Sequence, residues 1–272
     1  MPSGVHLTVH GARGSAPTSG RDVVRYGGHT TCFGVDGVDG RQIIFDCGTG
    51  MAFAAALRHE VPTEYHVFLT HYHFDHLQGL QFFSPLYDEQ HRFVFYGRPP
   101  EGLTLAEAIR GVFRPPWFPV DIDDDVERRR YVAIGDEPIT LDGFEITHTT
   151  LRHPQGVTAY RIDRGNRSVV IATDHEAGEP DADARLTALA AEATVLLHDA
   201  QYTPGEYDAY RGWGHSTWRD AVAAARGAEV ERLILTSHDP NRSDAAIDDI
   251  VRQARREFPL VDAAREGMRI AL

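Results

Sequence analysis

Short apolar segments, each five or six residues long and rich in β-branched side chains, recur along the chain between glycine and polar turns. Segments of this kind are typical of buried β-strands. They predict strands at residues 5–10, 31–35, 41–46, 65–70, 92–96, 144–149, 157–162, 168–173, 194–198 and 232–236. An Asp-Gly-Val-Asp-Gly turn at 36–40 joins the second and third segments, so the early strands are expected to pair as antiparallel hairpins.

Helical patterns fall between the later strands. Thr104 and Glu107 have the spacing of a capping box, and residues 181–193 are rich in alanine. Thr217 and Ser243 are good N-cap residues in front of two further helical patterns. Strands interleaved with helices predict an α/β fold, with layered sheets flanked by helices, in a single domain of 272 residues.

The composition is that of an ordinary globular domain, with 42% hydrophobic and 25% charged residues. No apolar run approaches the ~20 residues that span a bilayer, and the amino terminus lacks a signal-peptide pattern, so we expect a cytoplasmic protein without a membrane partner. Cys32 and Cys47 are expected to be reduced thiols. A net charge of −13 argues against DNA or tRNA as a partner, while a metal ion could still attract a small anion. The acidic stretch at 121–125 lacks the pattern of a calcium loop.

The strongest chemical signal follows the apolar segment at 65–70, where His71, His73, Asp75 and His76 form a His-x-His-x-Asp-His run. Alternate residues of an extended segment share a face, so the first three side chains should converge, and a turn into a helix would bring His76 alongside. Imidazoles and a carboxylate are ligands of zinc and similar metals. Further ligand-type residues stand just after later predicted strands: His153, Asp174 and His238.

These motifs, in this order, resemble those of the metallo-β-lactamase superfamily over nearly the whole chain. The resemblance implies an αββα sandwich of two mixed sheets flanked by helices. It also implies two divalent metal ions, Zn²⁺ first, with Mn²⁺ or Fe²⁺ as alternatives. The implied ligands of one ion are His71, His73 and His153, those of the other are Asp75, His76 and His238, and Asp174 bridges both. Asp46 would fix the orientation of the ligand loop, or would be an ordinary turn carboxylate.

The fold name alone does not decide the reaction. The redox branch of the superfamily places a glutamate where this chain has His73, which argues against redox chemistry. Two motifs, Leu-Leu-His-Asp-Ala at 196–200 and Gly-His-Ser-Thr at 214–217, resemble the phosphodiesterase and ribonuclease Z branch. There Asp199 would orient His215, which would protonate the leaving oxygen. The alternative is that Asp199 merely ends a strand and His215 precedes a helix cap. The predicted catalytic residues are Asp75, Asp199 and His215.

Residues 11–15, 26–32, 46–50 and 212–218 resemble bacterial enzymes allied to phosphoribosyl cyclic phosphodiesterase and to cyclic-nucleotide phosphodiesterases. The chain departs from that group at His29, Cys47 and His175, where asparagine, alanine and threonine are more usual. Whether His29 and His175 touch substrate or metal is left open by the sequence. Aromatic residues near the motifs are candidates either for stacking a nucleobase or for packing: Phe113, Trp117, Phe118, Tyr202 and Trp213.

The leading prediction is therefore a metal-dependent phosphodiesterase that hydrolyses a small, cyclic nucleotide or sugar phosphodiester through a hydroxide bridging two metal ions. The alternatives are a hydrolase of a lactone, thioester or β-lactam, ribonuclease Z-like RNA processing, and a noncatalytic metal-binding or ligand-sensing protein. Ribonuclease Z proteins carry a long basic arm, whereas only twenty residues separate His153 from Asp174. The expected partner is a small phosphodiester, and the family resemblance implies a homodimer.

Overall fold

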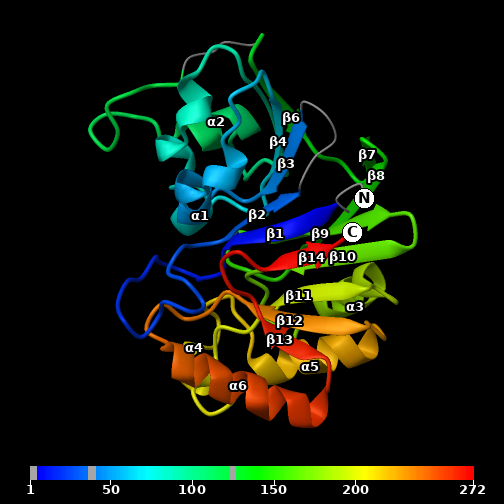
Figure 1. Cartoon of the computed structure of the whole chain (residues 1–272). Helices are drawn as coiled ribbons and strands as arrows, with labels where there is room; N and C mark the ends of the chain where they lie inside the picture. The colour runs from blue at the N-terminus through cyan, green and yellow to red at the C-terminus, as the bar shows by residue number, and fades with distance from the viewer. Residues whose placement is uncertain (1–4, 36–40, 123–126) are drawn as a thin grey trace.

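The computed structural model describes residues 5–35, 41–122 and 127–272. Within these residues, two seven-stranded sheets lie face to face and helices cover the outer face of each sheet (Figure 1). This arrangement confirms the predicted αββα sandwich of two mixed sheets. The predicted turn at 36–40 and residues 123–125 of the acidic stretch lie outside the described residues.

The first sheet has the strand order β14-β1-β2-β3-β4-β5-β6. Its strands are β1 (His6–Gly11), β2 (Cys32–Val35), β3 (Arg41–Phe45), β4 (Glu64–Phe68), β5 (Arg92–Gly97), β6 (Arg129–Ala133) and β14 (Arg269–Ala271). Strands β1 to β3 pair antiparallel, as expected for the early hairpins, and β3 to β6 pair parallel. The first and last strands, β1 and β14, are antiparallel neighbours, which joins the two ends of the described chain.

The second sheet has the order β13-β12-β11-β10-β9-β8-β7. Its strands are β7 (Ile139–Leu141), β8 (Phe144–Leu151), β9 (Val157–Arg164), β10 (Arg167–Ala172), β11 (Val195–Asp199), β12 (Arg232–Thr236) and β13 (Val261–Ala263). Strands β7 to β10 pair antiparallel and β10 to β13 pair parallel. Every strand predicted from the sequence is present within two residues at each end, whereas the short strands β6, β7, β13 and β14 were not predicted.

Helices α1 (Thr49–Phe53) and α2 (Leu105–Arg110) lie outside the first sheet, and α3 (Pro180–Ala190), α5 (Trp218–Gly227) and α6 (Asp244–Glu257) lie outside the second. The shorter helices are α4 (Tyr207–Tyr210), η1 (Ala55–Leu57), η2 (Phe74–His76), η3 (Leu80–Phe82) and η4 (Ser84–Tyr87). Thr104 forms the predicted capping box, and Thr217 and Ser243 cap α5 and α6 as expected. Among the described helices, none is both long and apolar enough to cross a membrane.

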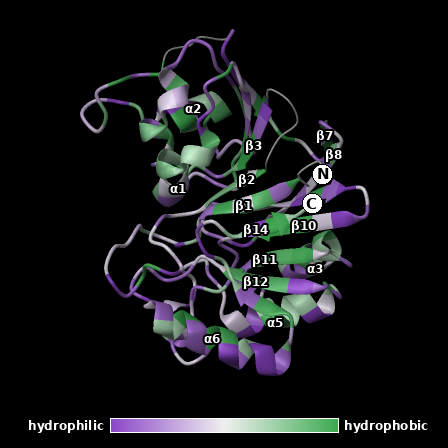
Figure 2. Ribbon diagram, viewed as in Figure 1, coloured by the Kyte–Doolittle hydropathy of each residue, from purple (hydrophilic) through white to green (hydrophobic). Residues whose placement is uncertain are grey.

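The alternation of side chains along the strands produces three apolar layers. In β10, Val169 and Ile171 face the space between the sheets, while Val170 faces the helices. In β3, Phe45 belongs to the inter-sheet layer and Ile44 to the layer under α1 and α2. Because both faces of these strands are buried, they are apolar nearly throughout, and the polar residues gather on the outer faces of the helices (Figure 2).

One edge of the sandwich brings polar loops together. Strands β4, β10, β11 and β12 all end at this edge, and the β8–β9 connection returns there because β9 runs antiparallel to β10. The two sheets are linked at this point by a hydrogen bond from the Thr158 N–H to the Thr70 carbonyl at 2.8 Å. The carboxyl ends of parallel strands are the usual place for a site in sheets of this kind.

Candidate metal centre

A buried carboxylate anchors the loop that follows β4. Asp46, at the end of β3, is fully buried and has a φ of 60°. Its Oδ1 accepts a hydrogen bond from the Thr70 N–H at 2.8 Å, and its Oδ2 accepts from the Thr70 hydroxyl and from His76 Nδ1, each at 2.8 Å. Burial raises the pKa of Asp46 against the effect of these donors. Asp46 holds both ends of the 70–76 loop, as the family resemblance implies.

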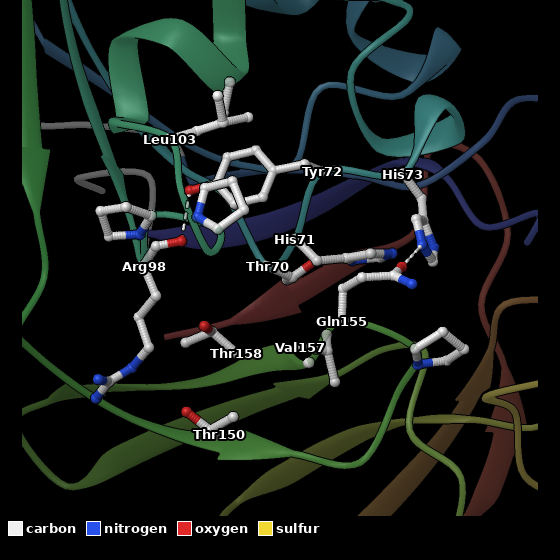
Figure 3. A pocket seen from close by; sticks show the side chains of 15 residues that line it. Thr70, His71, Tyr72, His73, Arg98, Leu103, Thr150, Gln155, Val157 and Thr158 are labelled. Carbon is white, nitrogen blue, oxygen red and sulfur yellow. Dashed lines mark hydrogen bonds between the residues drawn. The ribbon is translucent and has the colours of Figure 1, made fainter.

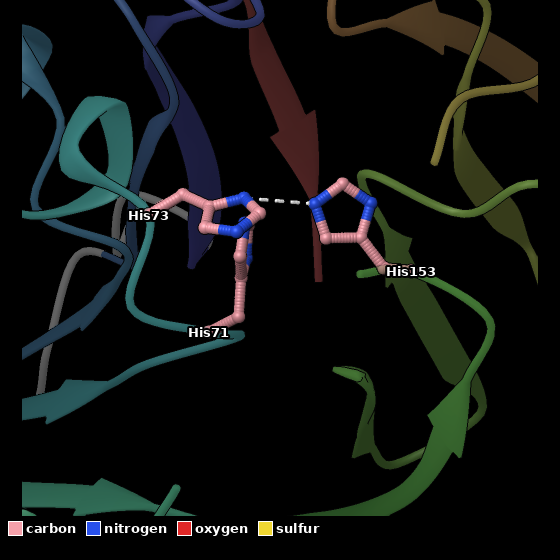
Figure 4. Close-up of side chains that lie close together, drawn as sticks. All are labelled: His71, His73 and His153. Atoms are coloured by element: carbon pink, nitrogen blue, oxygen red, sulfur yellow. Dashed lines mark hydrogen bonds between the residues drawn. The ribbon is translucent and has the colours of Figure 1, made fainter. Parts of the chain in front are cut away.

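Three imidazoles converge where the two sheets meet (Figure 4). His71 and His73 come from the loop after β4, and His153 comes from the β8–β9 connection. Their ring centroids lie 4.6, 4.7 and 4.8 Å apart, and His153 Nε2 lies 2.9 Å from His73 Nδ1. Zn–N bonds of ~2.0–2.1 Å place two ligand nitrogens of a tetrahedral ion about 3.3 Å apart. The 2.9 Å between His153 Nε2 and His73 Nδ1 is close to this spacing, and the ligand atoms of all three rings lie within 4.8 Å of one another.

The outer nitrogens of two of these rings are held by oxygen atoms. His73 Nε2 lies 2.9 Å from the side-chain oxygen of Gln155, and His153 Nδ1 donates to the Gly214 carbonyl at 2.8 Å. Hydrogen bonds of this kind fix the orientation and tautomer of metal-binding histidines. The sequence pattern did not identify Gln155 or Gly214 for this role, although both stand in loops that the motifs singled out.

Asp174 lies between the three imidazoles and a second group of ligand-type residues. It follows β10, has a φ of 53° and is buried. Its Oδ2 lies 3.1 Å from His76 Nε2 and 3.7 Å from His71 Nε2. Asp75 Oδ2 lies 3.3 Å from the same nitrogen of His76 and accepts the Ser15 N–H at 2.9 Å. A carboxylate in the position of Asp174 can contact two ions.

The charges of this group shift one another's pKa values. Burial lowers the pKa of His76, but the surrounding carboxylates, led by Asp174, outweigh burial and hold it well above its usual value. Burial raises the pKa of Asp174, but His76, together with His215 and His71, outweighs burial and holds the pKa well below its usual range. Burial, with His76 nearby, lowers the pKa of His71 well below normal. The raised pKa of His76 reflects an excess of negative charge that a cation would neutralise.

One ring nitrogen indicates that a metal ion suits the cluster, which is formed by His71, His73, Asp75, His76, His153 and Asp174. His71 Nδ1 lies 3.0 Å from the Thr70 hydroxyl, but His71 Nε2 is buried and has no hydrogen-bond partner among the described residues. A buried polar atom without a partner costs ~1–3 kcal/mol, so such atoms are rare unless a bound group satisfies them. His71 belongs to two of the three groups of residues whose ligand atoms lie within 4.8 Å of one another in the described chain, one with His73 and His153 and one with His76 and Asp174. The residues present therefore fit a divalent metal ion.

A carboxylate and an imidazole form a hydrogen-bonded pair next to Asp174. His215 Nδ1 lies 2.7 Å from Asp199 Oδ2, while Asp199 Oδ1 accepts the N–H groups of Ser216 at 2.8 Å and Gln201 at 3.2 Å. The ligand-type atoms of Asp174, Asp199 and His215 lie within 4.8 Å of one another. Burial lowers the pKa of His215, but Asp199 and Asp174 outweigh it and raise the pKa to about 9. His215 is therefore protonated at neutral pH.

A buried glutamate that the sequence analysis missed supports the loop before α5. Glu176 is 2% exposed, and its carboxylate accepts the N–H groups of Gly212 at 2.7 Å and Gly214 at 3.0 Å. Gly214 has a φ of 91°, and a Cβ there would lie 2.2 Å from His153 Nδ1. The only sequence signal for Glu176 is its position two residues after Asp174 at a strand end.

The structure does not bring His238 into either group of potential ligands. His238 Nε2 donates to the Ala264 carbonyl at 2.9 Å, and its ring lies edge-on to Tyr26 with centroids 5.8 Å apart. Burial lowers the pKa of His238 to about 4 despite the hydrogen bond to Ala264. Its neighbour Ser237 faces the cluster instead and donates its hydroxyl to Asp174 Oδ1 at 3.1 Å.

The two other histidines that the sequence left open also lie outside these groups. His29 Nδ1 lies 3.3 Å from the Thr49 hydroxyl, and its ring stacks on Phe53 at 5.0 Å. His175 Nε2 lies 3.2 Å from Asp183 Oδ1, and burial lowers its pKa to about 3. Neither belongs to a group of three potential metal ligands within the described ranges.

The candidate aromatic residues divide into buried and exposed side chains. Phe113 and Tyr202 are buried, and Phe118 packs against the apolar layer under the first sheet. Trp117 and Trp213 are 79% and 63% exposed. Of these two exposed residues, Trp213 is the nearer in sequence to the Asp199–His215 pair, since it stands two positions before His215.

A pocket of about 510 Å³ opens beside the imidazoles (Figure 3). Its walls come from the loop after β4, from residues 98–103 after β5 and from the β8–β9 connection. Gln155 reaches from this wall to His73. The lining combines apolar with uncharged polar side chains and one arginine, including Tyr72, Leu103, Val157, Thr150, Thr158 and Arg98.

Comparison with known proteins agrees with this geometry. The family described as beta-lactamase superfamily domain matches residues 41–238, from the start of β3 to two residues past β12, and the chain belongs to this superfamily. Ribonuclease Z of Myxococcus xanthus is 26% identical over 271 residues, which cover 85% of this chain and 88% of the relative. The motifs at 196–200 and 214–217 resemble the branch of the superfamily to which this relative belongs.

Two solved structures share the fold over nearly the full length of the chain. A diphosphatase from the PhnP family has a TM-score of 0.69 at 18% identity, and 98% of each chain is covered. The short form of human tRNase Z has a TM-score of 0.65 at 19% identity, again with 98% of each chain covered. At these identities the likeness concerns the fold alone.

Proposed function

We propose that the protein is a metal-dependent phosphodiesterase that hydrolyses a small phosphodiester, such as a cyclic nucleotide or a related sugar phosphodiester. The observation that carries the proposal is the Asp199–His215 pair, which lies within 4.8 Å of Asp174 at the edge of the metal cluster. An alkoxide leaving group needs a proton, whereas a thiolate or a carboxylate leaves without one. A protonated imidazole in this place is therefore useful for a phosphodiester and much less so for a thioester.

The proposed metal ligands are the residues that the structure gathers at this edge: His71, His73, Asp75, His76, His153 and Asp174. Divalent ions held there would lower the pKa of coordinated water and balance charge on the phosphoryl oxygens. Two such ions would outweigh Asp75 and Asp174 by about two positive charges, so the centre would attract an anion although the chain has a net charge of −13.

His215 acts as the proton donor in this proposal. A pKa of about 9 keeps it protonated at neutral pH, and Asp199 occupies its Nδ1 at 2.7 Å. Nε2 is the nitrogen left to protonate a leaving oxygen. Asp199 in turn is held by the Ser216 and Gln201 N–H groups, so it is a positioning residue that does not need to touch the substrate.

The pocket beside the imidazoles gives room for one organic substituent of the diester. Its volume of about 510 Å³ lies within the ~300–1,000 Å³ of small-molecule sites. Arg98 contributes one cation to its wall, but this side chain already donates to Asp136 at 2.9 Å and to the Gly135 carbonyl at 2.8 Å. A pocket with these walls suits a nucleobase or sugar better than a second phosphate.

Ribonuclease activity is the second candidate, because the relative from Myxococcus xanthus is named ribonuclease Z. The interval between His153 and Asp174 is filled by the β9–β10 hairpin, whose strands are joined across residues 165–166. It has no room for a long basic arm, and the acidic chain would repel a polyanion. These observations favour the small diester.

The test is turnover by metal-loaded protein with bis(p-nitrophenyl) phosphate, a panel of cyclic nucleotides and a structured RNA, with a β-lactam and a thioester as comparison substrates. We expect hydrolysis of small diesters that is abolished by a chelator and restored by Zn²⁺ or Mn²⁺. Hydrolysis of the thioester or β-lactam alone, or no turnover of any diester by protein shown to hold metal, contradicts the proposal. Faster cleavage of the RNA than of every small diester favours the second candidate.

A further inference from the structure

The two sides of the cluster offer different ligands. The side around His153 has three imidazoles, from His71, His73 and His153 itself, in addition to Asp174. The side around His76 has that imidazole and the carboxylates of Asp75 and Asp174. What completes the second side is the Ser237 hydroxyl, which donates to Asp174 Oδ1 at 3.1 Å and is fully buried.

Ser237 owes its position to the backbone after β12. The strand ends at Thr236, and Ser237 has a φ of 54°, a left-handed conformation that is uncommon for a residue other than glycine. This turn aims Ser237 at the cluster and sends the next side chain elsewhere. A residue held in such a conformation is typical of a site that needs a particular direction.

Three contacts hold His238 away from the cluster. Its ring donates from Nε2 to the Ala264 carbonyl at 2.9 Å and lies edge-on to Tyr26, while its backbone N–H donates to the Ala12 carbonyl at 2.9 Å. The charged groups that affect it most are Arg13 and Arg242, and not Asp75 or Asp174. Rotation toward the cluster would break the bond to Ala264 in a place where His238 is only 4% exposed.

We propose that the centre binds its two divalent ions with unequal affinity, one tightly at the side with three imidazoles and one weakly at the side where Ser237 stands in place of a second histidine. This inference rests on the metal dependence in the proposed function. Neutral hydroxyl oxygens bind first-row metals far less well than imidazole, so the second side has one strong nitrogen ligand of its own.

The ligand types also predict a different metal preference at each side. Imidazoles favour Zn²⁺, whereas carboxylates, hydroxyls and water suit Mn²⁺ and Mg²⁺. The side with His71, His73 and His153 should keep Zn²⁺ during dialysis, while the side with Asp75 and His76 should exchange its ion readily. The protein would then function with one resident ion and one supplied by the surrounding solution.

The experiment is equilibrium dialysis of chelator-treated protein against buffered Zn²⁺, with metal per chain measured by mass spectrometry. We expect one Zn²⁺ per chain at low free metal and a second only at about 100-fold or more higher free Zn²⁺. Mn²⁺ added to the protein carrying one Zn²⁺ should fill the second side. None of these measurements uses turnover, so their outcome is separate from that of the substrate panel.

Variants at the two adjacent positions sharpen the test. Ser237→His, or Ser237→Asp as a smaller alternative, should bring the two affinities within about tenfold of each other, because each supplies a stronger ligand to the second side. His238→Gln should leave both affinities unchanged within about twofold, because its ring does not face the cluster. Circular dichroism and thermal unfolding without metal check that each variant is folded.

Three results would overturn the inference. Two Zn²⁺ ions that bind wild-type protein with equal affinity would show that Ser237 does not weaken the second side. Loss of the second ion in His238→Gln would show that His238 enters the centre when metal is present. Protein that takes up no metal would remove both this inference and the metal-dependent function.

Discussion

The two sheets contribute to the centre in different ways. The first sheet supplies its ligand-type side chains from one loop at 70–76, which Asp46 holds at both ends. The second sheet supplies single residues from separate places, namely the loops after β8 and β10, the end of β11 and the loop before α5, and each has its own hydrogen bonds. A defect at the anchor of the first sheet should disturb several ligands together, whereas a defect in the second sheet should remove one function.

The largest effect is expected at the proton donor of the second sheet. His215→Ala should lower kcat by ~10²–10⁴ for diesters with an alkoxide leaving group, because that oxygen would leave without a proton. The kcat for bis(p-nitrophenyl) phosphate should fall much less, since p-nitrophenolate is a stable anion that leaves without a proton. The measurement is kcat on both substrates, with metal content determined alongside. His29→Asn, at a histidine outside the cluster, is the control.

An equal loss of kcat on both substrates would show that His215 shapes the centre instead of donating a proton. Asp199→Asn separates the two roles further, because it removes the charge beside His215 Nδ1 while the imidazole stays in place. It should reproduce part of the loss on the alkyl diester and little of it on the p-nitrophenyl diester.

The anchor of the first sheet should give the next largest effect. Asp46→Ala leaves the donors of Thr70 and His76 without a partner in a fully buried place, which should cost about 3 kcal/mol in the free energy of unfolding. Metal affinity should fall by ~10–100-fold, because the ring of His76 loses its orientation. Urea unfolding and Zn²⁺ dialysis measure the two losses.

Asp46→Asn is the matched variant. It keeps the shape, but its amide would present a donor toward His76 Nδ1 and favour the tautomer with the proton on Nε2, the nitrogen that faces Asp174. The loss of metal affinity should therefore persist while most of the stability returns. Full metal binding by Asp46→Asn would show that the carboxylate only supports the fold.

Two glycines of the second sheet's loops allow a controlled test of smaller size. Gly214 and Gly212 have φ values of 91° and 88°, but a Cβ meets His153 Nδ1 at 2.2 Å only at Gly214, and nothing within 4 Å at Gly212. Both alanine variants should lose ~1–3 kcal/mol of stability from the left-handed backbone. Only Gly214→Ala should also lose Zn²⁺ affinity. Equal Zn²⁺ affinities in the two variants would contradict the role of Gly214.

The pKa of His215 should report on the charge at Asp174. In metal-free protein the pKa lies at about 9, so His215 is protonated below that pH and loses its proton as the pH rises through it. Because bound cations would neutralise Asp174, one of the charges that raise this pKa, metal loading should lower it by about one unit, equivalent to about 1.4 kcal/mol. NMR titration of the imidazole resonances with and without Zn²⁺ measures this, and an unchanged midpoint contradicts it.

The difference between the sheets also explains what could be predicted from the sequence. The loop at 70–76 is contiguous and follows an apolar strand, so its ligand-type residues were apparent as a pattern. Which of Ser237 and His238 faces the cluster could not be predicted from such a pattern, because it depends on a φ of 54° at Ser237. Glu176 and Gln155 were missed because their partners lie in distant segments. The strands β6, β7, β13 and β14 were missed since they are short or only partly apolar and depend on pairing with neighbours.

The smallest effect is expected at the surface of the second sheet's loops. Trp213 is 63% exposed, and its ring lies edge-on to Tyr210. Tyr210 stacks on Tyr202, and the ring of Tyr202 lies 5.9 Å from that of His215. Trp213 can therefore stack a nucleobase whose phosphodiester lies at the centre, and Trp213→Ala should raise KM about fivefold, or about 1 kcal/mol, with kcat unchanged. Only diesters that carry a base should respond, and Trp117→Ala should change neither constant. A rise in KM for a base-free diester as well would mean that Trp213 shapes the loop, and substrate selection would then lie with the pocket beside the imidazoles.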